Sequence, residues 1–159
     1  QAAFEAGMTL MNAEMWQCFG HLVDSGKLGA DVSARLIASS RISATDIDKA
    51  EKVREKFTCE LDMALSNVDA LVMPTLPSFP LSRAQALAGR ADLNISYLTR
   101  PFNLSGHPSL TMPLRNVLGK PVGLQLVGAK GQDELICDIA KRISNKVKYN
   151  VKVLEKKHV

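Results

Sequence analysis

The sequence predicts an α/β protein in which helices pack on a small sheet. Long segments with apolar residues at intervals of three and four alternate with short apolar runs that end in proline or glycine. The 159 residues are 46% hydrophobic and 23% charged, which is an ordinary globular composition. A chain of this length can bury a core without a disulfide or a metal.

The first predicted helix runs from Phe4 to about Leu22, and it ends near Asp24-Ser25-Gly26. Its apolar residues are spaced as one helical stripe. They are Phe4, Met8, Met11, Met15, Phe19 and Leu22. We expect this stripe to face the core, and the alternative is a methionine-lined ligand groove.

A turn at Gly29 to Asp31 precedes a short predicted helix, Val32 to Ala38. Ser43 followed by Asp46 then indicates a capped start of a second long helix, because both side chains can satisfy first-turn amides. The predicted buried stripe of that helix is Ile47, Ala50, Val53, Phe57, Leu61, Ala64 and Leu65. The residues predicted to face water are Lys49, Lys52, Glu55, Lys56 and Glu60.

The helical period ends at Asp69, and the apolar run Ala70 to Met73 predicts a strand buried on both faces. Residues 74–90 hold three prolines and no steady period, so we expect a surface loop with one helical turn around Ala84 to Ala88. A loop of this length usually borders a site or an interface.

Two further runs, Ser109 to Met112 and Pro121 to Val127, predict strands joined by a hairpin-type turn at Asn116 to Lys120. Gly123 and Gly128 predict either close backbone approach or a bulge. These strands are too few to complete a sheet whose inner strands are covered on both sides, so part of the sheet is missing from this sequence.

The last predicted helix begins at Asp133, with Leu135, Ile136, Ile139, Ala140 and Ile143 on one face. Residues 147–153 then alternate apolar and polar side chains. Exposed lysines in such a strand discourage intermolecular pairing, so this pattern is typical of an edge strand.

The net charge of +4 comes from the C-terminal end of the chain. Residues 141–159 carry a net charge of +6, and the rest of the chain carries −2. These lysines follow a helix end and a strand, with no nucleic-acid recognition motif beside them, so we expect them to be solvated and expect no nucleic-acid partner.

No run of about 18 apolar residues is present, which excludes a membrane span. No secretory signal is visible at the N-terminus, and the missing initiator Met fits a chain that begins part-way through a longer protein. Cys18, Cys59 and Cys137 are far apart and lack metal-ligand spacing. They predict buried thiols in a reduced, cytoplasmic protein.

The sequence provides no convincing catalytic set. Ser105 and His107 are near neighbours, but no G-x-S-x-G elbow is present, and His21 suits a helix end. The carboxylate pairs Glu51/Glu55 and Glu60/Asp62 fit a solvated helix face. Glycine-rich phosphate-binding and dinucleotide-binding patterns are absent. We therefore expect no catalytic residue, no metal and no cofactor in this chain.

Three ordered segments stand out. They are D-A-L-V-M-P-T-L-P at 69–77, T-R-P-F-N-L-S-G-H-P at 99–108 and P-V-G-L-Q-L-V-G at 121–128. In order and spacing they resemble the C-terminal part of the amidase signature family. The segment Arg41 to Asp46, with Ala50 and Arg54, also looks like that family's helix entry, and the resemblance extends from about Glu14 to Ile143.

The resemblance implies a mixed α/β/α sheet fold and hydrolysis of a carboxamide C–N bond by a Ser-cis-Ser-Lys triad. The family's triad and its glycine- and serine-rich loop precede the part that this sequence resembles, and no such stretch is present. Residues 1–159 are then one incomplete domain, with 146–159 as a basic edge-strand tail. The expected partners are the remaining N-terminal part of the amidase domain and a small amide substrate, with a homo-oligomer also possible. The chain alone should be inactive.

The resemblance also implies that the loop from Ser96 to His107 forms a wall of the amide pocket, with Ser96, Thr99, Arg100 and Asn103 as its substrate-binding residues. The residues themselves favour a purely structural role for Asn103 and Gly106, in a tight turn. Gln125 either bonds to neighbouring backbone or lines the pocket.

Family members that serve as glutaminyl-tRNA amidotransferase subunits tend to have Asp at the position of Ser96. This departure favours a small-amide or acylamide hydrolase. The rival hypothesis is a free-standing, non-catalytic binding or interaction module derived from the same fold.

Overall fold

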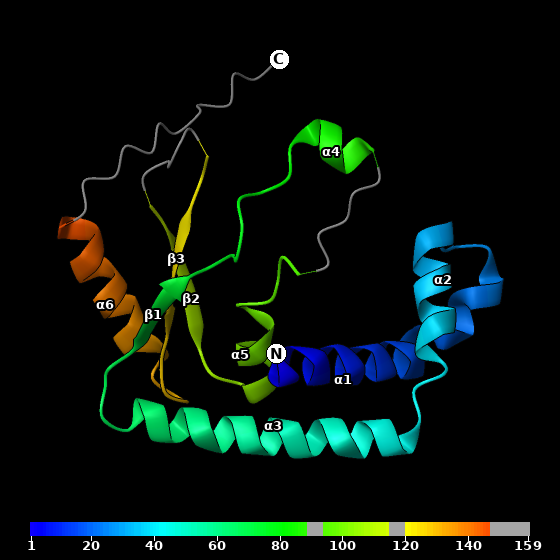
Figure 1. The fold of residues 1–159 in the computed structure, drawn as a ribbon, viewed down its shortest axis with the longest axis horizontal. Coiled ribbons are helices and arrows are strands. Elements are labelled where there is room, and N and C mark those ends of the chain that lie inside the picture. Colours follow the sequence, from blue (N-terminus) through cyan, green and yellow to red (C-terminus); the bar gives the residue numbers. More distant parts are fainter. Residues whose placement is uncertain (89–93, 115–119, 147–159) are drawn as a thin grey trace. The chain divides into compact units, whose positions relative to one another are not determined.

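The computed structural model describes residues 1–88, 94–114 and 120–146 (Figure 1). The chain divides into two compact units. The first comprises Gln1–Ala64 and Arg100–Gly106, and the second comprises Leu65–Thr99 and His107–Val159. Among the described residues, no helix is both long and apolar enough to cross a bilayer.

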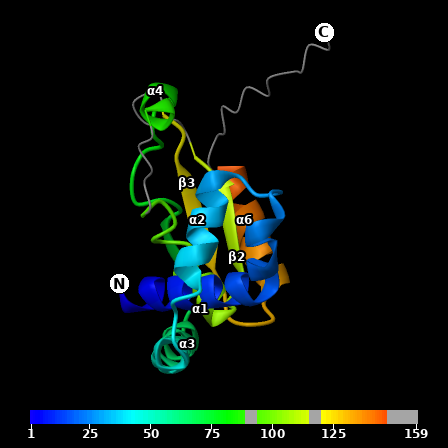
Figure 2. The same ribbon diagram turned by 90° about the vertical axis from the view of Figure 1, so that its right-hand side faces the viewer.

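The first unit is helical. Its elements are α1 (Ala2–Phe19), the 3-10 helix η1 (Gly20–Ser25), α2 (Ala30–Ser39), α3 (Ala44–Leu65) and α5 (Arg100–Ser105). The predicted first helix is confirmed as α1 continued by η1, and it stops where Gly26 adopts a φ of 70°. Figures 1 and 2 together show α1 crossing α3, and Figure 1 shows α5 close to the N-terminal end of α1.

The predicted core stripe of α1 is wrong. The buried residues of α1 are Ala3, Ala6, Gly7 and Leu10. Met11 and Phe19, which belong to the predicted stripe, are 38% and 51% exposed. Small side chains let the helices approach closely: Ala6 and Leu10 pack with Ala50 of α3, and Ile47, Val53 and Leu104 surround them. Hydrophobic periodicity gives little weight to alanine and glycine, which is why it points to the wrong side of this helix.

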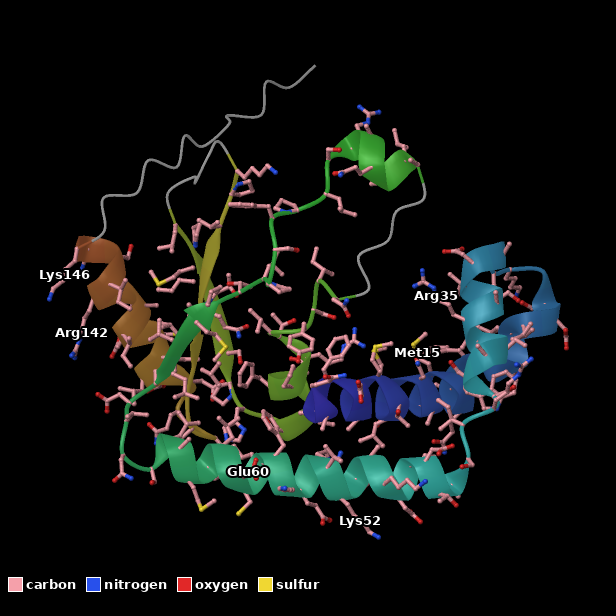
Figure 3. All side chains as sticks on the ribbon, viewed as in Figure 1. Met15, Arg35, Lys52, Glu60, Arg142 and Lys146 are labelled. Carbon is pink, nitrogen blue, oxygen red and sulfur yellow. The ribbon has the colours of Figure 1, made fainter. Side chains whose placement is uncertain are left out.

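The capped start of α3 is confirmed. The Ser43 hydroxyl donates to Asp46 Oδ2 at 2.6 Å, the Ser43 amide donates to the same oxygen at 3.1 Å, and the Asp46 amide donates to Ser43 Oγ at 3.2 Å. The buried residues Ala50, Leu61 and Leu65 follow the predicted stripe, although Ala64 is exposed. The predicted outer face is exposed, and Figure 3 shows Lys52 pointing away from the helix into solvent.

This cap makes the stability of α3 sensitive to acid. Hydrogen bonds from the Ser43 side chain and backbone lower the pKa of Asp46 below its ordinary value of 3.8. A carboxyl with a depressed folded-state pKa stabilises the fold above its unfolded pKa, and that contribution disappears as the pH falls through the folded pKa. We expect the stability difference between the wild type and Asp46→Asn to shrink towards zero as the pH falls below about 4. Urea unfolding followed by the fluorescence of Trp16 measures it, and a difference independent of pH would contradict this role.

The described residues of the second unit form a three-stranded sheet and two helices. The elements are β1 (Leu71–Pro74), α4 (Arg83–Leu87), β2 (Ser109–Pro113), β3 (Gly123–Val127) and α6 (Asp133–Lys146). The strand order is β1-β3-β2, and both pairings are antiparallel. The short helix predicted around Ala84 is confirmed as α4, whose Ser82 and Gln85 form a capping box.

The prediction that the first strand is buried on both faces is wrong for the described residues. Within the described sheet β1 pairs only with β3, and Val72 is 57% exposed. The apolar run correctly indicated a strand, but burial depends on neighbours that the run itself does not specify. The exposed Val72 lies directly opposite Leu126, which is fully buried in the middle strand.

The predicted pairing of the two later strands is confirmed, with Ser109 opposite Val127 and Pro113 opposite Gly123. Most of the turn predicted between them, and the edge strand predicted at 147–153, lie outside the described residues. The register between β2 and β3 is continuous, so no bulge is present there. Close approach of neighbouring atoms therefore explains Gly123 and Gly128. A Cβ on Gly123 would lie 2.7 Å from Thr75 Oγ1.

One face of the sheet is apolar and covered by α6. Met112, Leu126 and Ala140 form its buried core. Four partly buried residues pack against them: Leu110, Leu124, Ile139 and Ile143. This is the predicted face of the last helix, and Arg142 and Lys146 point away from the sheet (Figure 3).

The predicted burial of the three thiols is wrong. Cys18, Cys59 and Cys137 are all free and exposed, although each does lie in a helix. The buried positions of α3 and α6 are instead Ala50, Leu61, Leu65, Ile136 and Ala140.

Candidate functional site

Two of the predicted substrate-binding residues, Ser96 and Thr99, lie in the second unit within a double turn, Asn94 to Thr99. The Tyr97 amide donates to the Asn94 carbonyl at 2.9 Å. The Ser96 carbonyl accepts both the Thr99 amide at 3.1 Å and the Thr99 hydroxyl at 3.3 Å. Consecutive turns of this kind give the segment a defined shape, and they hold Ser96 and Thr99 together.

Gln125 joins this double turn to the sheet. The residue is in the middle of β3 and only 2% exposed, and its Nε2 donates to the Leu98 carbonyl at 2.9 Å. Of the two roles predicted for Gln125, the hydrogen bond to backbone is therefore confirmed. Because strand side chains alternate, Gln125 lies on the face opposite Leu124 and Leu126, which pack towards α6.

The same face of the sheet carries two threonines that sequence reasoning missed. Thr111 lies opposite Gln125 in β2, and Thr75 follows β1. Their hydroxyl oxygens are 3.3 Å apart, and Gly123 between them has no side chain to separate them. The Thr75 amide also donates to the Gly123 carbonyl at 3.0 Å. This face also carries Leu71, Met73 and Val127, and its polar side chains gather around Gln125.

The other two predicted residues, Arg100 and Asn103, lie in α5 of the first unit. The segment predicted as a loop is here a short helix, with Gly106 at a φ of 73° after its end. The guanidinium of Arg100 lies 4.9 Å from the centre of the Phe4 ring. A Cβ on Gly7 would lie 3.1 Å from Arg100 Cγ, so glycine makes room for this side chain on α1.

Arg100, the cationic residue of α5, is partly buried. Desolvation lowers the pKa of Arg100, although arginine still keeps its positive charge at neutral pH. Asn103 is exposed, whereas Phe102 is buried with its ring centre 6.4 Å from that of Phe57. Helix α5 therefore offers one cation and one exposed amide on a well-anchored turn, and both groups can bind the polar atoms of an amide.

The remaining candidates do not assemble into a hydrolytic set. The Ser105 hydroxyl donates to the Phe102 carbonyl at 3.3 Å, which is a local role at the end of α5. His107 is buried, and His21 is exposed in η1. Glu51 and Glu60 pair with Arg54 and Lys56 at 2.8 and 3.9 Å along α3. The described part of the chain holds no cluster of three or more His, Cys, Asp or Glu side chains that could bind a metal.

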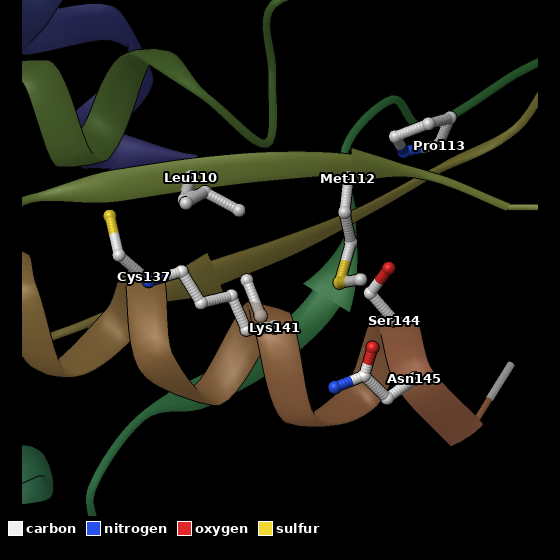
Figure 4. Close-up of a pocket in the computed structure, with 8 residues that line it drawn as sticks. Leu110, Met112, Pro113, Cys137, Lys141, Ser144 and Asn145 are labelled. Carbon is white, nitrogen blue, oxygen red and sulfur yellow. The ribbon is translucent and has the colours of Figure 1, made fainter.

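A groove of about 630 Å³ lies between β2 and α6 (Figure 4). It is mostly apolar, with Lys141, Ser144 and Asn145 at its α6 side. None of the predicted substrate-binding residues lines it. It lies on the α6 side of the sheet, whereas Gln125 and the double turn are on the opposite side, so the groove and the Gln125 face are distinct features.

Comparison with known proteins finds amidases and amidotransferase subunits that match most of this chain. A profile of the family described as Amidase matches residues 3–137. A glutamyl-tRNA(Gln) amidotransferase subunit from Dehalococcoides mccartyi is 33% identical over 132 residues, which are 79% of this chain and 27% of that protein. The corresponding subunit from Methanosarcina mazei is 30% identical over 145 residues, or 87% of this chain and 30% of that protein.

Solved structures that resemble this chain also include an amidase and an amidotransferase subunit. A crystal structure of an amidase superposes with a TM-score of 0.82 at 28% identity, covering 92% of this chain and 36% of that one. The glutamyl-tRNA(Gln) amidotransferase subunit from Thermotoga maritima gives a TM-score of 0.62 at 28% identity, covering 80% and 30%. The chain spans about a third or less of the length of these relatives. The mixed α/β fold and the resemblance inferred from the three motifs are confirmed: this chain belongs to the amidase signature family.

Proposed function

We propose that this chain is the C-terminal portion of an amidohydrolase that cleaves a carboxamide C–N bond, and that it supplies core strands and part of the substrate pocket. The observation that carries the proposal is the coverage. The relatives match 79% to 92% of this chain but only 27% to 36% of their own length. In this proposal residues 1–159 form one incomplete domain with a basic tail at 146–159, and the Ser-cis-Ser-Lys triad belongs to the N-terminal part.

The exposed apolar surface supports a missing partner of this kind. Several large apolar side chains face solvent in the described residues. The most exposed are Phe19, Met63, Val72 and Leu87, at 51%, 62%, 57% and 77%. Val72 belongs to a strand at the sheet margin, where a further strand of an amidase domain would cover it. Exposed apolar area on this scale favours association.

The proposed substrate-binding residues are Ser96 and Thr99 in the double turn of the second unit, and Arg100 and Asn103 in α5 of the first. Hydroxyl and side-chain amide groups can donate to the carbonyl of an uncharged amide and accept from its N–H, whereas the guanidinium can only donate to the carbonyl. With Ser96 in place of the Asp typical of amidotransferase subunits, we favour a small amide or acylamide over glutamine. Three unpaired thiols suit a reducing compartment, and we propose the cytoplasm.

Complementation tests the proposal. The purified chain is expected to show no amide hydrolysis, because loss of a nucleophile and its base costs about a million-fold in rate in serine hydrolases. Mixing it with the N-terminal region of a related amidase, ending where the match to this chain begins, should produce amidase activity measured with a chromogenic acylamide. The controls are the N-terminal region alone and a mixture in which its nucleophilic serine is replaced by alanine.

Hydrolysis by the chain alone would refute the assignment of the triad to the missing part. A stable chain that never gains activity on mixing would instead support the rival, a non-catalytic module. Both outcomes are distinguished from simple misfolding by circular dichroism of the chain before mixing.

A further inference from the structure

Gln125 has an unusual position for an uncharged polar side chain. It is at the centre of the middle strand and 2% exposed, between Leu124 and Leu126. Its neighbours across the sheet, Met73 and Thr111, are not titratable. Burying an amide is unfavourable unless its polar atoms are bonded. Here the donor is satisfied by the Leu98 carbonyl, 27 residues earlier in the chain.

The bond is directed at a backbone atom of the double turn between the two predicted wall residues. Ser96 and Thr99 are tied to each other through the Ser96 carbonyl. Those local bonds fix the shape of the turn but not its position on the sheet. The 2.9 Å bond to Leu98 supplies that second constraint, from a strand that is itself held on both sides. A hydrogen bond in such a dry setting is stronger than one exposed to water.

We propose that Gln125 is a positioning residue that holds the double turn, residues 94–99, against its own face of the sheet and so sets the affinity of these wall residues for substrate. The consequence for substrate rests on the proposed amidase function, whereas the positioning of the turn does not. The general reason is that a displacement of about 1 Å in a substrate-positioning segment can cost up to about a hundred-fold in kcat/KM.

Two substitutions test the bond itself. Gln125→Met keeps the length of the side chain and removes the donor at every pH. Gln125→Glu keeps the shape and makes the donor depend on pH, because a neutral carboxyl can donate its O–H to the Leu98 carbonyl and a carboxylate cannot. Burial disfavours the charged form, so the pKa of the new carboxyl should rise. Gln17→Glu, on an exposed residue of α1, is the matched control.

The first readout is hydrogen exchange of the Tyr97 and Thr99 amides in the full chain, corrected for the intrinsic effect of pH. Gln125→Met should lower their protection about tenfold, as expected for one lost hydrogen bond. Gln125→Glu should match the wild type near pH 5 and lose about the same protection near pH 8. Gln17→Glu should not differ from the wild type at either pH.

Unchanged protection in Gln125→Met overturns the proposal, and so does a Gln125→Glu variant that behaves alike at both pH values. The amides of β3 are read in the same experiment. If their protection falls together with that of the turn in both variants, Gln125 serves the sheet itself, and the positioning role is refuted.

The second readout is the complemented enzyme. Gln125→Met should raise KM about tenfold and leave kcat within about twofold of the wild type, because the bond acts on the wall and not on the reacting atoms. A fall in kcat with KM unchanged contradicts the proposed effect on affinity. If complementation with the wild-type chain yields no activity, the amidase proposal fails, and the exchange experiment still decides whether Gln125 positions the turn.

Discussion

Replacing Leu126 by alanine is expected to lower the stability of the second unit by about 2 to 5 kcal/mol. Leu126 is 0% exposed and packs with Met112 and Ala140 between the sheet and α6. Removing its branched end loses the hydrophobic transfer free energy of the missing atoms and leaves a cavity. Because β3 is paired with a strand on each side, it cannot easily move to fill that cavity. A loss of this size is a large fraction of the total stability of a typical domain.

Val72→Ala is the matched control, because Val72 lies directly opposite Leu126 in β1 but is 57% exposed. We expect a change of about 0.5 kcal/mol or less, as for other surface sites. Hydrogen exchange of the β3 amides in native conditions measures both variants, since Trp16 fluorescence reports the first unit only. Equal effects of the two substitutions would show that the described burial of Leu126 does not exist in solution.

The same pair of residues can test the proposed partner. In the complemented amidase, a further strand on β1 would bury Val72, and Val72→Ala should then become destabilising, in contrast to its small effect in the chain alone. Leu126→Ala should weaken both states. The effect of the substitution in β1 should therefore depend on the partner, whereas the effect of the substitution in β3 should not.

The elements whose signals are local were predictable from sequence. The Ser43/Asp46 cap, the helical turn of α4 and the apolar face of α6 each depend on residues within a few positions of one another. Capping and helical periodicity act over one or two turns, so the sequence contains the whole cause.

Features that depend on distant neighbours were not predictable. The apolar run of β1 indicated the strand, but its place at the margin follows from the order β1-β3-β2, which is set by pairing between residues 50 to 56 positions apart. Likewise, the side of α1 that is buried depends on close contact with α3 through Ala6 and Ala50. A stripe of methionines shows where a helix is apolar and not which partner it meets.

Some residues of the candidate site were likewise predictable from sequence, and others were not. Motif resemblance singled out Ser96, Thr99, Arg100 and Asn103, and the structure links the first two by hydrogen bonds at the Ser96 carbonyl. Thr75 and Thr111 were missed, because their side chains come together only when three separate segments, which hold Thr75, Thr111 and Gly123, pair in the sheet. A signal was present: Gly123 was expected to allow close approach, but the sequence did not show which side chains would fill the space.

A second large effect is expected from Gly128→Ala, which should destabilise the second unit by about 1 to 3 kcal/mol. A Cβ on Gly128 would lie 2.5 Å from Ile136 Cγ2, far inside van der Waals contact. Neither partner can move easily. The Gly128 amide is tied to the Pro108 carbonyl at 3.0 Å, and Ile136 is 3% exposed with a β-branched, stiff side chain.

A double-mutant cycle isolates this contact. Ile136→Leu removes the methyl group on Cβ and keeps the side-chain volume, so alone it should cost less than about 1.5 kcal/mol. In its background Gly128→Ala should cost at least about 1 kcal/mol less than in the wild type, because the clashing atom is gone. Exchange of the β3 amides measures all four proteins of the cycle. Strict additivity would locate the cost of the new methyl group elsewhere than at Ile136, and a Gly128→Ala variant as stable as the wild type would mean that β3 and α6 are farther apart than described.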